Sequence, residues 1–227
     1  MKMSTKKTAL FGLLTALALI LGLMDRALPV SAFLGGVIPG IKLGLANTVL
    51  LYAVYLMDWK SSVALMLTKV VLSGFLFGSL SAILFSLSGG VLSLAAMLLL
   101  RKHPERGALA VVVMTTAAEI YLLCRNPHPR GQMLIVTILI GLAFLAGIII
   151  LILTRKGTVT QVMGTSLAGA VTHNIGQVIM ACIILRTPSL MISYLPTLIG
   201  IGTAVGCLTG IVTDRVLAVL RIRPNIN

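Results

Sequence analysis

The stretch LSAILFSLSGGVLSLAAMLLL (80–100) contains no charged side chain. A helix needs about 20 predominantly apolar residues to cross the hydrocarbon core of a bilayer, so this stretch is long enough to span a membrane. On either side of it, short polar breaks separate further apolar stretches. This pattern predicts an all-α fold, a polytopic transmembrane helix bundle with about eight spans. The other predicted spans are 8–24, 41–57, 61–78, 107–124, 133–154, 161–185 and 191–220.

The composition also fits a protein surrounded by lipid. Hydrophobic residues make up 58% of the 227 residues and charged residues only 10%, whereas a soluble domain carries about 25% charged residues. The net charge of +13 is not arranged as a basic stripe with interleaved aromatic residues, so we expect no nucleic-acid partner. The three cysteines are far apart without a CxxC pair, which argues against a metal site or a disulfide framework.

Positive charges in the polar breaks orient the predicted bundle. If the N-terminal lysines are cytoplasmic, the breaks on their side hold more Lys and Arg than the breaks on the opposite side, as the positive-inside rule requires. We therefore expect a multi-pass protein of the cell membrane with both termini in the cytoplasm. The cytoplasmic set is Lys60, Arg101, Lys102, Arg106, Arg155, Lys156, Arg221 and Arg223, and the opposite set is Arg26, Arg125, Arg130 and Arg186.

Small residues recur at helical spacing in several spans. Gly202, Gly206 and Gly210 follow one another at intervals of four in the last span, and Gly12 and Ala16 do so in the first. Residues with little or no side chain let helix backbones approach closely in a membrane, where van der Waals contact drives association. These stripes predict tight helix packing.

Lys69 is a candidate functional residue because it lies midway through the predicted span 61–78. A lysine at the centre of a spanning helix costs about 2.5–3.5 kcal/mol on insertion scales, and such residues normally face the bundle interior. Two interpretations remain open. Lys69 either contributes to a ligand-binding cavity or is a structural partner for a carbonyl group or for Glu119.

His173, Asn174 and Gln177 form a second candidate group in the middle of the span 161–185. Their spacing places them on one helical stripe. Hydrogen-bonding side chains at this depth are costly unless they meet partners or water. They therefore form either a ligand-binding face or an interhelical hydrogen-bond network.

The segment 27–40 is apolar but broken by prolines and glycines. Irregular backbone at membrane depth is stable only where protein or a water-filled cavity surrounds it, so we expect a loop folded over the outer mouth of the bundle, with a plain surface loop as the alternative. Lys42 and Asn47 follow it. Lys42 is either an interfacial anchor or a cation at the cavity mouth, and Asn47 lies further along the same helix. Asp25 and Asp58 are expected at the membrane interface.

No catalytic motif occurs in the sequence. Walker A, HExxH and GxSxG patterns are missing, and the three aspartates are separate. Magnesium-dependent diphosphate chemistry needs clustered carboxylates. We therefore expect neither an enzyme nor a cofactor or metal.

Three segments resemble one known family. IPGIKLGLANTVLLYAVYL (38–56), SGFLFGSLSAILFSLSGGVLSLAAM (73–97) and GTSLAGAVTHNIGQV (164–178) are similar to the Gx transporter family, whose members are often called heptaprenyl diphosphate synthase component I. The family is similar to the substrate-binding (S) components of energy-coupling factor transporters. The resemblance covers about 8–100 and 158–220.

The resemblance implies a six-helix S-component-like core with an outward-opening cavity and a lid at 27–40. It places Lys42, Asn47, Lys69, His173, Asn174 and Gln177 near the ligand, and Gly12 and Ala16 against a transmembrane coupling subunit. Residues 101–157 are not covered by the resemblance, and we expect them to form an inserted helical hairpin. The whole chain, residues 1–227, is expected to form a single transmembrane domain.

These observations support one functional hypothesis and leave two alternative hypotheses open. The first hypothesis is a substrate-binding membrane subunit for uptake of a small molecule, working with a partner ATPase module. Lys42 and Lys69 favour an anionic or carbonyl-rich ligand, such as a vitamin, a flavin-like or quinone-like molecule, or a diphosphate. The alternative is a membrane subunit of an isoprenoid, prenyl diphosphate or quinone-linked enzyme assembly. A third possibility is a scaffold in which the polar residues only hold helices together.

Overall fold

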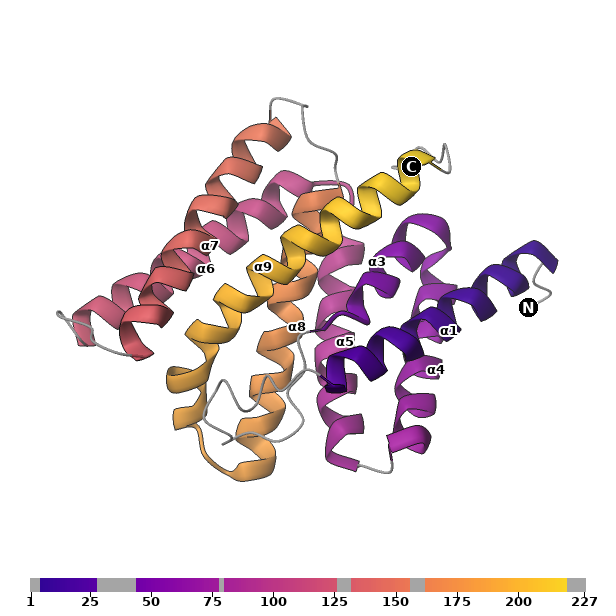
Figure 1. Cartoon of the computed structure of the whole chain (residues 1–227), viewed down its shortest axis with the longest axis horizontal. Helices are drawn as coiled ribbons and strands as arrows, with labels where there is room; N and C mark the ends of the chain where they lie inside the picture. Colours follow the sequence, from indigo (N-terminus) through magenta and orange to yellow (C-terminus); the bar gives the residue numbers. More distant parts are fainter. Residues whose placement is uncertain (1–4, 28–43, 78–79, 126–131, 156–161, 220–227) are drawn as a thin grey trace.

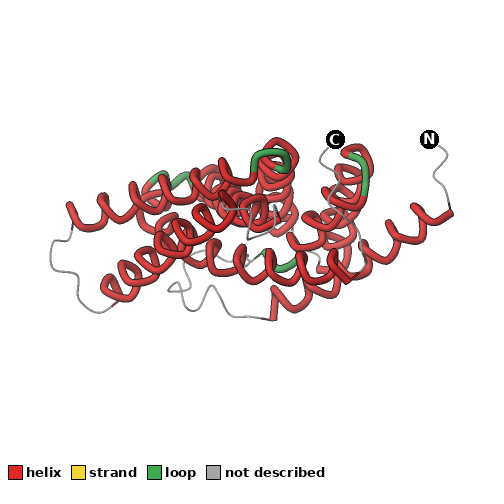
Figure 2. Tube along the Cα trace, turned by 90° about the horizontal axis from the view of Figure 1, so that it is seen from above, coloured by secondary structure: helices red, strands yellow, loops and turns green. Residues whose placement is uncertain are grey.

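A computed structural model describes residues 5–27, 44–77, 80–125, 132–155 and 162–219. Helices joined by short loops make up this described part, which contains no strand (Figure 2). The predicted all-α bundle is confirmed, and each of the predicted spans corresponds to a helix. The helices are α1 (Thr5–Ala27), α3 (Asn47–Leu56), α4 (Trp59–Phe77), α5 (Leu80–Leu100), α6 (Pro104–Arg125), α7 (Gln132–Arg155), α8 (Val162–Leu185) and α9 (Ser189–Val219).

Most of the long helices have the length and composition of membrane spans. Within the described residues, 6 helices are long and apolar enough to cross a bilayer, and they belong to α1, α4, α5, α6, α8 and α9. Large apolar side chains on their outer faces, such as Phe75 and Leu99, are exposed by 84% and 77%. Such a surface requires lipid. The chain is therefore a multi-pass membrane protein.

The second predicted span, 41–57, differs from the structure. Helix α3 begins only at Asn47 and has 10 residues, which is about 15 Å at 1.5 Å per residue and half of the ~30 Å hydrocarbon core. All of its residues except Leu56 are buried. It is enclosed by α1, α4, α5, α8 and α9 (Figure 1). The segment is thus a short internal helix, and its apolar character reflects contact with protein on every side.

Helix α8 lies at the centre of the bundle, in contact with α3, α5, α6, α7 and α9 (Figure 1). The predicted small-residue stripe on α9 packs against it. A Cβ atom on Gly202 would lie 2.6 Å from Asn174 Nδ2, and one on Gly210 would lie 2.7 Å from Met163 Sδ. Since ordinary contacts are longer, the α8–α9 interface depends on glycine at these positions.

The hairpin α6–α7 and the helix α1 occupy opposite ends of the molecule (Figure 1). The hairpin packs against α8 and α9. Helix α1 contacts α3 and α4 among the described helices, and its outer face is open. Gly12 and Ala16 are exposed on that face, and no heavy atom lies within 4 Å of a Cβ built on Gly12.

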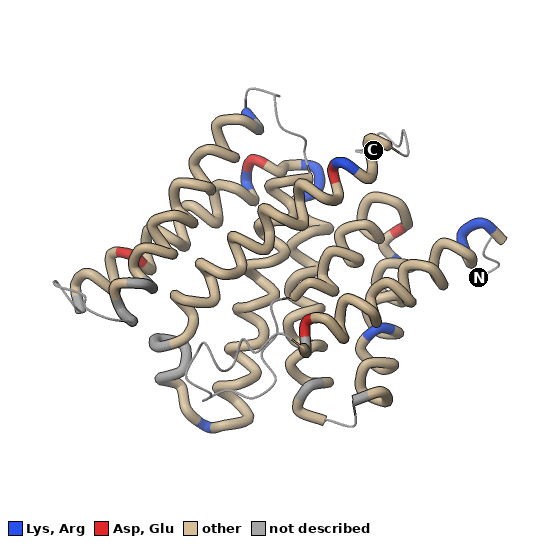
Figure 3. The backbone as a smooth tube through the Cα atoms, viewed as in Figure 1, with Lys and Arg blue, Asp and Glu red and all other residues tan. Residues whose placement is uncertain are grey.

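Basic residues gather at one edge of the bundle (Figure 3). They lie where α5 meets α6, at the end of α7 and near the end of α9, and they include Arg101, Lys102, Arg106, Arg155 and Arg215. The connection between α8 and α9 at the opposite edge contains Arg186. The prediction that both termini are cytoplasmic depends on this unequal distribution of basic residues between the two edges.

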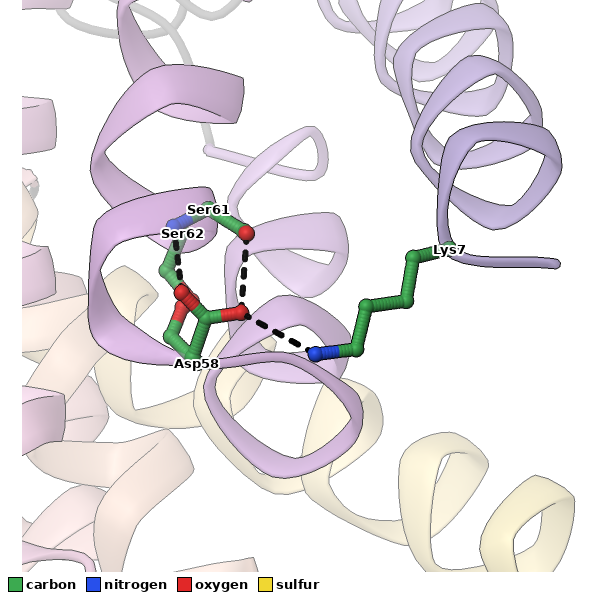
Figure 4. Close-up of polar contacts among 4 residues, drawn as sticks. All are labelled: Lys7, Asp58, Ser61 and Ser62. Carbon is green, nitrogen blue, oxygen red and sulfur yellow. Dashed lines mark hydrogen bonds and ion pairs between the residues drawn. The ribbon is translucent and has the colours of Figure 1, made fainter. Parts of the chain in front are cut away.

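An ion pair joins the start of α1 to the connection between α3 and α4 (Figure 4). Lys7 Nζ lies 3.8 Å from Asp58 Oδ1. The Ser61 hydroxyl donates to Asp58 Oδ1 at 3.0 Å, and the Ser61 N–H donates to Asp58 Oδ2 at 3.3 Å. The hydrogen bond from the Ser61 hydroxyl, helped by that N–H and by the Lys7 charge, lowers the pKa of Asp58 below its usual value.

The Asp58 contacts are expected to make stability depend weakly on acid pH. Because the pKa is lowered in the folded protein, the ionised carboxylate stabilises the fold above its unfolded pKa of about 4, and this contribution is lost as pH falls through the lower folded value. Melting temperatures of the purified protein and of Asp58→Asn, measured between pH 6 and pH 3, should converge at the acid end. A constant gap between them would contradict this assignment.

Candidate ligand-binding site

The turn before α3 is built around Gly44 and Asp25. Gly44 has φ of 85°, a left-handed conformation that favours glycine. Its N–H donates to Asp25 Oδ2 at 3.0 Å, and its carbonyl accepts from the Asn47 N–H at 2.8 Å. Asp25 is only 2% exposed, so its side chain near the end of α1 is covered by protein. The buried turn needs an acceptor for its N–H, and the last part of α1 supplies one.

His173 lies between two glycines. A Cβ on Gly44 would stand 3.0 Å from His173 Cδ2, and one on Gly89 of α5 would stand 2.8 Å from both Cε1 and Nδ1. The ring is buried. Larger residues at either position would displace it, so α3, α5 and α8 meet here because both neighbours are glycine.

Asn47 and Ser93 link α3 to α5. The Asn47 amide Nδ2 donates to Ser93 Oγ at 2.6 Å, and both residues are buried. The Asn47 Oδ1 atom is buried without a hydrogen-bond partner. Buried polar atoms are normally paired in folded proteins, so each exception calls for an explanation such as a ligand or water.

Asn174 faces a different helix from Asn47, Ser93 and His173. Its Nδ2 donates to the Leu198 carbonyl of α9 at 2.7 Å, whereas the His173 ring faces α3 and α5. The predicted stripe is therefore divided between two interfaces, because successive residues of a helix point about 100° apart. Gln177, one turn further along α8, is buried.

Lys69 is buried on α4, which contacts α1, α3 and α5. Among the described residues α4 makes no contact with α8, and α3 and α5 each contact both helices. Lys69 and His173 thus lie on helices that do not touch each other in the described part of the chain, with α3 and α5 between them. The alternative that Lys69 pairs with Glu119 is wrong, since Glu119 lies on α6, away from α4, with its Oε2 buried and unpartnered. Lys42 lies outside the described residues.

The structure therefore brings together Asp25, Gly44, Asn47, Ser93 and His173, from α1, α3, α5, α8 and the turn before α3. We call these five residues the polar cluster. Sequence reasoning found Asn47 and His173 and missed the other three. One signal was present: the Gly89–Gly90 pair in an uncharged span marks a place where another group approaches the backbone closely.

The polar cluster offers hydrogen-bonding groups of several kinds in a low-dielectric interior. It contains a carboxylate, an amide, a hydroxyl and an imidazole. Within the described ranges, no three His, Cys, Asp or Glu side chains come together as a metal site. In such an interior, hydrogen bonds and charges act more strongly than in water. These are the kinds of group with which proteins form hydrogen bonds to small polar molecules.

Asp25→Ala is expected to lower the free energy of unfolding by about 1–3 kcal/mol, because it leaves the Gly44 N–H buried without its acceptor. Asp25→Asn keeps a side-chain oxygen in the same place and should recover most of the loss. Unfolding of both variants in detergent micelles, monitored by circular dichroism, checks this. Equal losses for alanine and asparagine would show that the hydrogen bond to Gly44 is not what matters.

A comparison with protein families finds a match along most of the chain. The model of a family described as heptaprenyl diphosphate synthase component I matches residues 14–143 and 128–216. Neither the curated proteins nor the solved structures yielded a match. The matched ranges include α3, α5 and α8, and with them Asn47, Ser93 and His173.

Proposed function

The chain belongs to the heptaprenyl diphosphate synthase component I family, and we propose that it is a substrate-binding membrane subunit for uptake of a small molecule. The observation that carries this proposal is the polar cluster, enclosed by apolar helices. Polar and ionisable groups inside a membrane are costly, and a functional role is their default explanation. The ligand would be vitamin-, flavin- or quinone-like.

Uptake requires a partner that supplies energy, and α1 offers a surface for one. Its face bearing Gly12 and Ala16 is open and exposed. Small residues allow another transmembrane helix to approach closely. We propose that an ATPase-driven coupling module docks there, in the cell membrane, with both termini of this chain in the cytoplasm. The basic edge of the bundle supports that orientation.

The family description favours a second candidate, a membrane subunit of a prenyl diphosphate or quinone-linked enzyme assembly. In either case we propose that this chain is not itself the catalyst. A prenyl diphosphate synthase would need clustered carboxylates to hold magnesium against the diphosphate. The carboxylates that the structure describes are dispersed: Asp25, Asp58, Glu105, Glu119 and Asp214.

A thermal-shift screen of the purified full chain tests ligand binding. Riboflavin, biotin, menadione and inorganic diphosphate are suitable probes, because any compound that binds only the folded form raises the melting temperature. Asn47→Leu is the control and should abolish the shift. Failure of every probe would count against the proposal.

Co-purification separates the two candidates. A tagged chain extracted gently from membranes should bring down an ATPase and a second membrane subunit if it serves uptake. Gly12→Leu, which adds bulk to the open face of α1, should weaken that association. Recovery of a soluble prenyl synthase without an ATPase would instead favour the enzyme assembly.

A further inference from the structure

The two buried asparagines leave the same kind of atom unpaired. The Asn47 amide donates to Ser93 Oγ, and the Asn174 amide donates to the Leu198 carbonyl. In both residues the side-chain oxygen, Oδ1, is buried without a partner. Both side chains are more than nine-tenths buried, with exposures of 4% and 1%. The described part of the protein thus supplies an acceptor for each side-chain amide nitrogen, but it supplies no donor for either side-chain oxygen.

The surroundings of Asn47 add another acceptor. The turn that precedes it holds the Asp25 carboxylate, whose Oδ2 already accepts the Gly44 N–H. That N–H is therefore not available to an anion. A phosphate or diphosphate carries mainly acceptor oxygens, and Asn47 Oδ1 is itself an acceptor, so such an anion would leave this buried oxygen without a donor.

We propose that the ligand of the polar cluster presents an N–H or O–H donor to Asn47 Oδ1. The class is a largely apolar molecule with an amide, imide or phenolic hydroxyl group, and not a diphosphate. This inference rests on the proposed function, since it names the chemistry of the same site. It narrows the ligand expected from the sequence, a small anionic or carbonyl-rich molecule, to one that carries a hydrogen-bond donor.

Asn174 provides an internal comparison. Its amide lies on the α9 side of α8, with Nδ2 next to Gly202 and donating to the Leu198 carbonyl. A change there removes an identical amide but leaves the polar cluster intact. If Asn47 recognises the ligand, the two asparagines will differ in their effect on ligand preference.

The test uses matched probes that differ in a donor. Menadiol carries two hydroxyls where menadione carries carbonyls, and riboflavin carries an imide N–H that 3-methylriboflavin lacks. Dissociation constants for these four compounds and for inorganic diphosphate are measured with the full chain in micelles. The donor form of at least one pair should bind about tenfold more tightly, the value of one good hydrogen bond.

Substitutions at the two asparagines show which of them is responsible for the preference for donor-bearing probes. Asn47→Leu should reduce the difference within the pair to about twofold or less, whereas Asn174→Leu and the acceptor-preserving Asn47→Asp should keep it near tenfold. Equal or tighter binding of the methylated or oxidised form, or of diphosphate, would overturn the inference while leaving the proposed function intact. A preference that survives Asn47→Leu would also overturn it. If none of the five probes binds, the proposed function fails together with the inference.

Discussion

Gly164→Ala is expected to lower the free energy of unfolding by about 2–3 kcal/mol or more, the range for adding atoms to a packed interior. A Cβ on Gly164 would collide with the Pro104 carbonyl at the start of α6. The opposing Gly107 is also close, since its Cβ would lie 2.5 Å from the Gly164 oxygen. Because backbone stands on both sides, the clash is relieved only by moving α6 away from α8.

The matched control is Gly12→Ala, the same chemical change on the open face of α1. Alanine is favoured over glycine in a helix by about 0.5–1 kcal/mol, so this variant should be neutral or slightly more stable. Denaturant titration in mixed micelles gives both values. Equal stability of Gly164→Ala and Gly12→Ala would contradict the close approach of α6 and α8.

His173→Leu is expected to weaken ligand binding by about tenfold or more, in addition to any loss of stability of the unliganded protein. The imidazole is the polar group held between Gly44 and Gly89, and loss of one ligand hydrogen bond is worth about 1.4 kcal/mol. Leucine is apolar and of similar size, and a buried polar group that loses its partner costs about 1–3 kcal/mol of stability, so binding and stability are measured separately. Isothermal calorimetry with the best probe, alongside thermal melting, measures both quantities.

His103→Leu is the control, because His103 is an exposed histidine that lies 3.4 Å from Glu105 outside the spans. It should bind ligand normally. If His173 served only to hold helices together, His173→Leu would lose stability with no selective loss of binding, which is the behaviour of a scaffold.

The spans were predictable because lipid imposes a simple rule on composition and length. The stretch 80–100 coincides with α5. The same rule failed at 41–57, because hydropathy does not distinguish a helix facing lipid from one enclosed by other helices. Gly44, whose positive φ precedes the start of α3, was the local signal of the later start.

The polar cluster was only half predictable for a related reason. Periodicity places His173 and Asn174 on one stripe, but it does not say which neighbouring helix each side chain faces. That depends on the positions of α3, α5 and α9, which are long-range contacts. Asp25 lies near the end of an apolar run, and only its hydrogen bond with the Gly44 N–H explains why it is buried by protein.

The most direct test of the central claim is native mass spectrometry of the full chain released gently from membranes. If the polar cluster binds a small molecule, the wild-type protein should retain one bound non-lipid mass, and Asn47→Leu should lose it while Gly12→Ala keeps it. Protein that carries only lipid, or a bound mass unchanged in Asn47→Leu, would contradict the account.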